Sequence, residues 1–319
     1  MLNKEITYNG TSNQCRLDKW LVDNNVLPDL SRAIAHNMIK GKAVLINGKI
    51  VHTGYKLRPN DIIQIHSLPE PEAKSIIVEA SETIAPILDI KQYIVQDTPD
   101  FVVIDKPANI LVHEDAKHKT GTLINALLEL YPKMSTIDSS NRPGVVHRLD
   151  KDVSGLIVFA KTKKMFACLK SQFQNRVIQK KYLALVHGKI AKPEGVIKFN
   201  IARSTQYAKM SARPSGTSGK EAITEWTVVK QYQHYTLVSI KTITGRTNQI
   251  RLHFNAIDHP LVGDHVYSST RYKNRNRNLN RILLHACYLS FNNILDEQLE
   301  FTSKPPPVFE NFLKGLAEN

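Results

Sequence analysis

This chain has little cysteine and no long apolar run. Its three cysteines, Cys15, Cys168 and Cys287, are odd in number and far apart. They suit a reducing compartment and provide neither a disulfide framework nor a paired-cysteine zinc motif. No apolar run approaches the length of a bilayer span, and residues 1–13 are too polar for a secretory signal. We therefore expect a cytoplasmic protein with no membrane association.

The chain also has fewer acidic than basic residues. It contains 29 aspartates and glutamates and 43 lysines and arginines, for a net charge of +14. Residues 1–67 carry +4 and residues 91–319 carry +14, while residues 68–90 between them carry −4. Two basic bodies separated by an acidic strip indicate two surfaces that contact one long anion. RNA fits this charge pattern better than a small acidic metabolite.

The length of 319 residues allows one large domain and one small domain. Residues 14–67 form the small one in our interpretation. Leu17, Trp20 and Leu21 have helical spacing, and a second helix is expected from a Ser31 cap to Gly41. An Asn-Gly pair at 47–48 predicts a hairpin over residues 43–51, and a last strand covers residues 62–65.

Residues 68–90, with three prolines among acids, are predicted to form a linker. The remainder, residues 91–319, is predicted to be one large domain of the α+β class, because no helices alternate regularly with its strands. A helix is expected around Met165–Phe173, and the basic segment 268–280 is expected to be a loop. The predicted strands are residues 101–104, 182–186, 223–229, 235–243 and 283–291.

The most informative stretch is Val145–Leu156, whose pattern predicts a strand, a tight polar loop and a second strand. The loop holds Asp150 between Arg148 and Lys151, and neighbouring positive charge favours an ionised carboxylate. A carboxylate on such a loop is a candidate nucleophile or base. The residues alone leave open a structural aspartate that caps the turn and pairs with the arginine.

His-Arg-Leu-Asp at 147–150, followed by Ser-Gly-Leu at 154–156, resembles the active-site signature of the RluA-type pseudouridine synthases. Residues 181–188 are similar to the family's tyrosine motif. Residues 244–253 are similar to its arginine motif, extended through residues 259–264. Three motifs in the same order are specific evidence. The resemblance covers roughly residues 95–315 and includes weaker matches at residues 105–107, 121–127, 284–286 and 305–307.

The small domain is similar to the RNA-binding module named after ribosomal protein S-four. This resemblance implies RNA contacts at four basic residues, Arg16, Arg32, Lys40 and Lys42. The alternative is that its helices only pack on the main body and that these charges are solvated.

The large domain's resemblance implies an isomerisation of uridine to pseudouridine that needs no cofactor and no metal. Asp150 would act near the anomeric region of the ribose, either by covalent addition or by removing a proton from the sugar. Arg251 would hold Asp150 through a two-point guanidinium contact. Tyr182 would lie against an extruded uracil. The alternative for Arg251 is a residue on the surface of a helix, and the alternative for Tyr182 is an aromatic residue of the core.

The same resemblance implies residues that contact the substrate. Arg148 would occupy the gap left by the extruded nucleotide or bind a phosphate, and Leu149 and Leu252 would close the pocket. Arg246 and Gln249 belong to the arginine motif and are expected beside the substrate. Apart from the resemblance, Lys106, Arg142, Arg203 and Lys209 are candidates for further phosphate contacts, and the alternative for each is a solvated charge.

Two positions depart from the family pattern. Val153 replaces the usual threonine or serine, and Asn248 replaces the usual histidine. Val153 lacks a hydroxyl that would brace the loop, whereas Asn248 keeps a donor and an acceptor. Both changes concern positioning and rate more than the class of reaction.

Residues 142–146 and 260–264 resemble the RluD branch, which implies a target in large-subunit (23S) ribosomal RNA. Transfer RNA is the alternative substrate, and we expect a monomer. One alternative function is that of a non-catalytic RNA-binding or ribosome-assembly protein. Another is a nucleoside or glycoside hydrolase, for which Asp152 would have to serve as the second acid.

Overall fold

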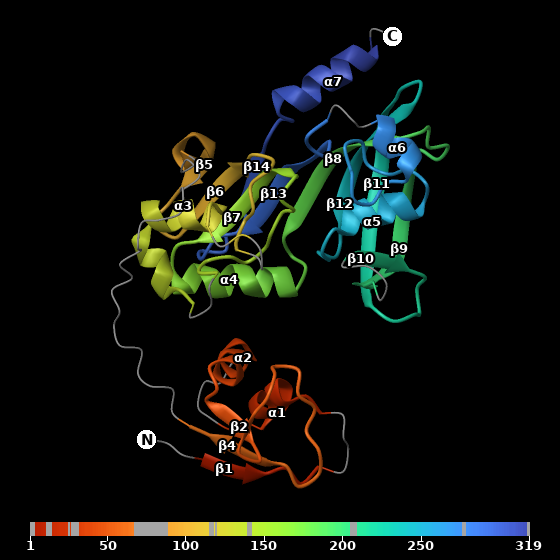
Figure 1. Ribbon diagram of the computed structural model, residues 1–319. Helices are drawn as coiled ribbons and strands as arrows, with labels where there is room; N and C mark the ends of the chain where they lie inside the picture. The colour runs from red at the N-terminus through yellow and green to blue at the C-terminus, as the bar shows by residue number, and fades with distance from the viewer. Residues whose placement is uncertain are drawn as a thin grey trace. The chain divides into compact units, whose positions relative to one another are not determined.

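The computed structural model describes residues 4–10, 15–24, 26, 32–66, 89–114, 118, 120–138, 142–204, 209–275 and 279–317. The chain divides into two compact units, residues 1–82 and residues 83–319, and Figure 1 shows both. The predicted linker falls almost wholly on residues 67–88, outside the described part, as does the predicted Ser31 cap. Among the described residues, no helix has the length and apolar character to span a bilayer.

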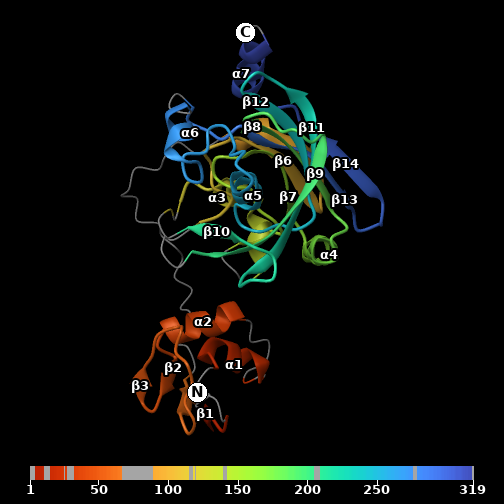
Figure 2. The ribbon, with the colours of Figure 1, turned by 90° about the vertical axis from the view of Figure 1, so that its right-hand side faces the viewer.

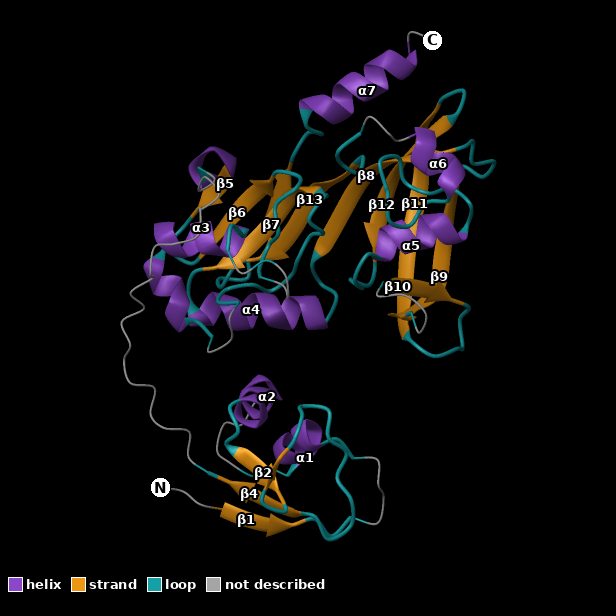
Figure 3. Cartoon of the chain, in the orientation of Figure 1, coloured by secondary structure: helices purple, strands orange, loops and turns teal. Residues whose placement is uncertain are grey.

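The first unit is a small antiparallel sheet with two helices, as Figure 3 shows by colour. The predicted hairpin is confirmed, because Asn47 (φ 52°) and Gly48 (φ 73°) both adopt the left-handed backbone of a tight turn. The first strand was not predicted, since the sequence placed the start of this domain at residue 14. In sheet order, the elements are β1 (Lys4–Thr7), β4 (Ile62–Ile65), β2 (Val44–Ile46) and β3 (Lys49–Ile50), with α1 (Leu17–Asp23) and α2 (Arg32–Lys40).

Apolar residues predicted from helical spacing form the core of this unit. Leu17, Leu21 and Ile39 are at most 1% exposed and cluster with Val44 and Ile63 from the sheet. Burial of such aliphatic side chains contributes about 2 kcal/mol each. The sheet therefore needs both helices to complete its hydrophobic core.

The second unit is built on one large sheet, which is antiparallel except where β13 runs parallel to β7. This confirms the predicted α+β class. The strand order along the sheet is β10 (Met210–Arg213), β9 (Glu194–Arg203), β11 (Lys220–Gln231), β12 (Tyr235–Thr242), β8 (Gln179–His187), β13 (Leu284–Asn292), β7 (Ser154–Ala160), β6 (Phe101–Lys106) and β5 (Ile94–Asp97), with β14 (Gln298–Thr302) paired to β13.

Helices pack at different ends of this sheet. Figure 2 shows α5 (Gln249–Ala256) beside β9, β10 and β11. The helix α4 (Lys163–Gln174) packs on β7 and β13. The remaining helical elements are η1 (Ile90–Tyr93), α3 (Leu123–Leu130), η2 (Pro132–Thr136), α6 (Thr270–Arg275) and α7 (Pro307–Ala317).

Two local predictions were wrong. The segment at 268–280 contains the short helix α6, although its polar composition predicted a loop. Val145 and Val146 form no strand, because only Val145 makes a single bridge, to Phe159 of β7. Their apolar side chains reflect packing against two of the hydrophobic clusters of this unit rather than an extended ladder.

Gly155 explains the Ser-Gly-Leu part of the sequence motif. It has φ of 118° and pairs with Ala286 where β7 and β13 meet. A Cβ atom at this position would lie 2.3 Å from the Ala286 carbonyl oxygen. Only glycine permits this backbone approach, and the approach joins the Asp150 loop to the centre of the sheet.

Candidate active site

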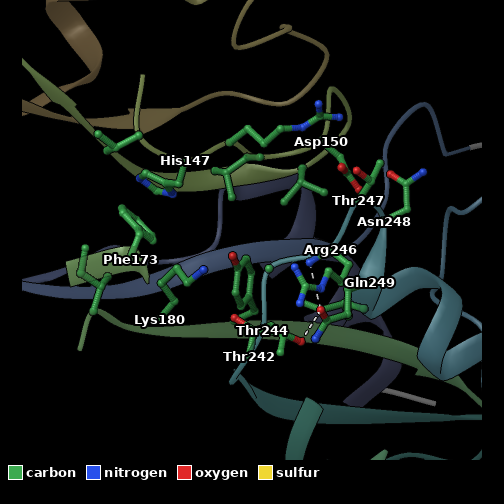
Figure 4. A pocket seen from close by; sticks show the side chains of 18 of the residues that line it. His147, Asp150, Phe173, Lys180, Thr242, Thr244, Arg246, Thr247, Asn248 and Gln249 are labelled. Atoms are coloured by element: carbon green, nitrogen blue, oxygen red, sulfur yellow. Dashed lines mark hydrogen bonds between the residues drawn. The ribbon is translucent and has the colours of Figure 1, made fainter. Parts of the chain in front are cut away.

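A pocket of about 590 Å³ opens where the motifs converge. Its walls come from the loop at 142–153, from the end of α4 and the beginning of β8, and from the segment at 242–251 that leads into α5. Figure 4 shows Asp150 and Asn248 toward one end, and His147, Phe173 and Lys180 toward the other. These segments are far apart along the chain, and the sheet brings them together.

Lys106 supports the loop that carries Asp150. Its side chain is wholly buried, and its Nζ donates to the carbonyl oxygens of Pro107 (2.9 Å), Ile110 (2.9 Å) and Lys151 (3.1 Å). Burial lowers its pKa to about 7. Lys106 is therefore neither the candidate phosphate contact nor the solvated charge that the sequence left open, because its side chain is not exposed.

His147 anchors the same loop from inside. Its Nε2 accepts a hydrogen bond from the Val158 amide at 3.0 Å, and its ring stacks on Phe173 with 4.8 Å between centroids. Burial lowers the pKa of His147 to about 3, so the ring is neutral and can accept this bond. The first residue of the His-Arg-Leu-Asp motif therefore holds the loop against β7.

Asp150 itself reaches the pocket, with 18% of its side chain exposed. Burial raises the pKa of its carboxyl group, while the charges of Arg251 and Arg148 act in the opposite direction. Arg251 Nη1 lies 3.6 Å from Asp150 Oδ2. The two predicted partners are thus adjacent.

The two-point contact of Arg251 is made with Asp264 instead. Arg251 Nε and Nη2 donate to the two Asp264 carboxylate oxygens at 2.7 and 3.0 Å. Burial would raise the pKa of Asp264, but Arg251 holds it below its usual value. The predicted two-point geometry on Asp150 was therefore wrong, because a second, fully buried carboxylate takes that face of the guanidinium. Asp264 ends the extended arginine motif but was not predicted as a site residue.

Tyr182 lines the pocket from β8 and is 8% exposed. It pairs with Ile240 on one side and Ala286 on the other, so it lies at the centre of the sheet. Burial raises its pKa, and the hydroxyl therefore stays protonated at neutral pH. The flat ring is available to a planar ligand in the pocket.

Four other predicted substrate residues have different environments. Arg148 is exposed and lines the pocket. Leu149 is buried and also lines it. Arg246 lines it too, although its Nε donates to the Glu221 carbonyl at 2.9 Å. Leu252 does not line the pocket; it faces a separate cluster that includes Ile201, so its prediction as a pocket residue was wrong.

Gln249 lines the pocket, but both its amide oxygen and its amide nitrogen make hydrogen bonds within the protein. Its Oε1 accepts from Thr244 (2.7 Å) and from the Arg246 amide (3.0 Å), as the dashed lines of Figure 4 mark. Its Nε2 donates at 2.9 Å to both the Ile223 carbonyl and the Thr224 hydroxyl. These four bonds favour a structural role, which joins α5 to β11, over the predicted contact with substrate.

Sequence reasoning missed Lys180, which precedes the tyrosine motif. It lies in the pocket wall with its Nζ over the Phe173 ring, 5.4 Å from the centroid. Burial lowers its pKa to about 8, with no described carboxylate acting in the opposite direction. A lysine of this kind suits an anionic ligand.

The ionisable side chains that line the pocket are mostly cationic. Asp150 is the one carboxylate among the described residues that line it, and Asp152 is not among them. A glycoside hydrolase would need a second positioned acid, so this arrangement opposes that alternative. The cations of the lining are Arg142, Arg148, Arg176, Lys180, Arg246 and Arg251.

In the first unit, the predicted RNA contacts differ in their freedom to bind. Lys40 and Lys42 are exposed. Arg16 is half exposed and donates to both carboxylate oxygens of Asp18, at 2.9 and 3.0 Å. The side chain of Arg32 lies outside the described part of the chain.

Comparison with known proteins identifies the family. Residues 100–256 match the RNA pseudouridylate synthase family, and residues 15–63 match the S4 domain. An uncharacterized RNA pseudouridine synthase of Bacillus subtilis is 33% identical over 99% of this chain and 98% of its own length. The chain therefore belongs to the RNA pseudouridine synthases, enzymes that isomerise uridine in RNA to pseudouridine, and it carries an N-terminal S4 domain that binds RNA.

Individual relatives show how far the likeness extends. The ribosomal large subunit pseudouridine synthase D of Haemophilus influenzae is 33% identical over 94% of this chain and 91% of its own length. Among solved structures, human RNA pseudouridylate synthase domain containing 1 matches with a TM-score of 0.57 and 25% identity, covering 71% of this chain and 95% of that one.

Proposed function

We propose that this enzyme modifies uridines in large-subunit (23S) ribosomal RNA and that Asp150 is the residue that reacts at the sugar. The observation that carries the assignment of Asp150 is its position as the single described carboxylate in a pocket lined by six cations, 3.6 Å from Arg251. The choice of RNA is supported by relatives named ribosomal large subunit pseudouridine synthase D, at 31–34% identity. We propose that the enzyme works in the cytoplasm, as a monomer, during ribosome biogenesis.

In this proposal the target nucleotide leaves its stack and enters the pocket. The uracil lies on the Tyr182 ring, which replaces the lost stacking. The exposed Arg148 occupies the gap in the RNA or binds a phosphate beside it. Cations around the pocket offset the free energy of base flipping through phosphate contacts, which makes binding sensitive to salt.

The reaction breaks the bond between the ribose and the ring nitrogen and joins the same sugar carbon to a ring carbon, which gives up its proton while the ring nitrogen takes one up. Ionised Asp150 either adds to the sugar carbon or removes a proton from the sugar. The positive charge of Arg251 favours the ionised form of this carboxylate and opposes the effect of its burial on the pKa. The carboxylate regains its charge at the end of either route. In the first route its bond to the sugar breaks as the sugar joins the ring carbon, and in the second route it returns the proton to the sugar.

The test compares wild type with Asp150→Asn and Asp150→Ala on a 23S fragment and on transfer RNA. We expect wild type to form pseudouridine in the 23S fragment, and both variants to bind RNA but form none. Asp152→Asn is the matched control and should keep its activity, because Asp152 is outside the pocket lining.

Other results would change the proposal in defined ways. Activity of Asp150→Ala would remove Asp150 from the chemistry. Activity of wild type on transfer RNA alone would replace the proposed substrate. RNA binding without any pseudouridine would favour a ribosome-assembly role.

A further inference from the structure

Asn248 lies against Asp150 at the point where this chain departs from the family pattern. It is the residue before α5 and adopts a left-handed backbone, with φ of 55°. Asparagine tolerates this conformation better than most residues. Its side chain lies between the Asp150 carboxylate and the Tyr267 hydroxyl. The residue therefore connects the proposed reactive group to the loop that follows Asp264.

The orientation of the Asn248 amide follows from its neighbours. If its nitrogen faces Tyr267, its oxygen faces the carboxylate of Asp150, and two acceptors oppose each other. In the reverse orientation the Asn248 nitrogen lies 3.0 Å from Asp150 Oδ1 and 2.8 Å from Oδ2, and the Asn248 oxygen accepts from the Tyr267 hydroxyl at 2.7 Å. An amide orientation is assigned from such a network, and only the reverse one satisfies all the groups.

Tyr267 supports both neighbours of Asp150. Its hydroxyl fixes the Asn248 amide, and its ring lies 4.9 Å from the guanidinium carbon of Arg251. Its backbone amide donates to Asp264 at 3.0 Å. Tyr267 is only 7% exposed. One buried side chain thus contacts both the amide donor and the cation that lie beside Asp150.

We propose that Asn248, held by Tyr267, is a positioning residue that keeps Asp150 ionised and aimed at the sugar. This inference rests on the proposed role of Asp150. The amide donates to the charged carboxylate, and this bond weakens when the carboxylate takes up a proton. Arg251 Nη1 lies 3.6 Å from Oδ2, whereas the amide contacts both oxygens at shorter range. Asn248 therefore fixes the rotation of the carboxylate, which a single cation cannot do.

Several other charges surround Asp150 and remain unchanged when Asn248 is replaced. The cations that act on it are Arg251, Arg148 and the buried Lys106, and Asp264 acts in the opposite direction. Tyr182 also faces it. Since these groups are common to wild type and variants, a shift in the pH profile reports the lost amide bond.

The experiment measures single-turnover rates of full-length protein on the 23S fragment between pH 5 and 9. Asn248→Gly keeps the left-handed backbone and removes the donor. We expect it to lower the rate at neutral pH roughly ten-fold and to move the acid limb up by about one pH unit. Asn248→Asp is isosteric, cannot donate when ionised and adds a like charge, so its limb should move further. Asn248→His restores a donor and should recover most of the rate.

Tyr267→Phe provides the second arm, because it removes the hydroxyl and keeps the ring over Arg251. It should shift the pH profile in the same direction as Asn248→Gly, and the double variant should shift no further than Asn248→Gly alone. Thermal unfolding of each variant separates folding defects from positioning.

The outcomes distinguish the two proposals. If Asp150→Asn is inactive but Asn248→Gly keeps the wild-type pH profile, the positioning role is wrong while the proposed function stands. If Asp150→Asn is active, the proposed function fails whatever the Asn248 variants do. A rate loss in Asn248→Gly without a pH shift would indicate a structural role and would also overturn the inference.

Discussion

Arg251 contacts two carboxylates at once. Nε and Nη2 pair with Asp264 at 2.7 and 3.0 Å, and the remaining Nη1 lies 3.6 Å from Asp150. The short pair is buried and the longer one faces the pocket. The two hydrogen bonds to Asp264 therefore fix the position of the guanidinium group. Its third nitrogen, Nη1, faces Asp150 at the distance of a longer ion pair.

Replacing Asp264 should affect both stability and activity. Asp264→Ala leaves a buried cation without its partner and should lower the free energy of unfolding by about 3 kcal/mol, as measured by urea denaturation. Asp264→Asn keeps the shape and should cost less. Arg251 would be free to move in either variant, so pseudouridine formation should fall as well. Unchanged stability in Asp264→Ala would show that the pair contributes nothing net.

The pH dependence of this effect has a defined sign. Because the folded protein lowers the pKa of Asp264, its stabilising contribution is fully present above the unfolded value of about 3.9. The contribution is lost as the pH falls through the lower folded value. Wild type should therefore lose stability in this acidic range, and Asp264→Asn should lose less over the same range.

Tyr182 combines a ring and a hydroxyl that can be separated by mutation. Tyr182→Phe keeps the ring, so RNA affinity should change little, whereas Tyr182→Ala should weaken it by about 1–3 kcal/mol. If the hydroxyl takes part in the chemistry, Tyr182→Phe will lower the turnover rate at saturating RNA. Full turnover by Tyr182→Phe would assign the ring alone to function. Since burial raises the pKa of Tyr182, wild type should show no basic limb from this residue below pH 10.

Lys180 should bind an RNA phosphate in its protonated form. Its pKa is lowered to about 8, so wild-type affinity should weaken as the pH rises through 8, where the lysine loses its charge. Lys180→Met should bind more weakly, show no such pH dependence and have a salt slope smaller by about one. Lys170, exposed on α4 outside the pocket lining, provides the control Lys170→Met. Equal pH dependence in wild type and Lys180→Met would contradict the assignment.

Variants in the S4 domain test whether this domain contributes to RNA affinity but not to turnover. The double variant Lys40→Glu and Lys42→Glu should weaken binding of the 23S fragment steeply at low salt, because both side chains are exposed. Turnover at saturating RNA should remain, since the pocket is unchanged. Lys49→Glu, exposed in the same domain, controls for net charge alone. Equal loss of affinity per charge in the control would indicate a general electrostatic effect.

Local sequence signals predicted many of the helices and strands, but not β9, β10, α3 or α7. The Asn-Gly turn and the helix around Met165 follow from contacts within a few residues, and both were confirmed. The edge strand β14 and the short helix α6 were missed, because long-range packing determines them more than periodicity does. The apolar pair Val145-Val146 predicted a strand that does not form. Long-range packing decides here too, since a loop that packs on hydrophobic clusters needs apolar side chains as a strand does.

The sequence by itself determined the kinds of chemical group present and the family to which the chain belongs, because the motifs are contiguous and specific. Only the tertiary structure decided which groups meet. The order β8-β13-β7 brings Tyr182 and Asp150 into one pocket, and the turn after α5 delivers Asp264 to Arg251. The tertiary structure also buries Lys106, for which the sequence left open a phosphate contact or a solvated charge. Such pairings depend on strand register and packing between distant segments, and no local pattern of residues carries that information.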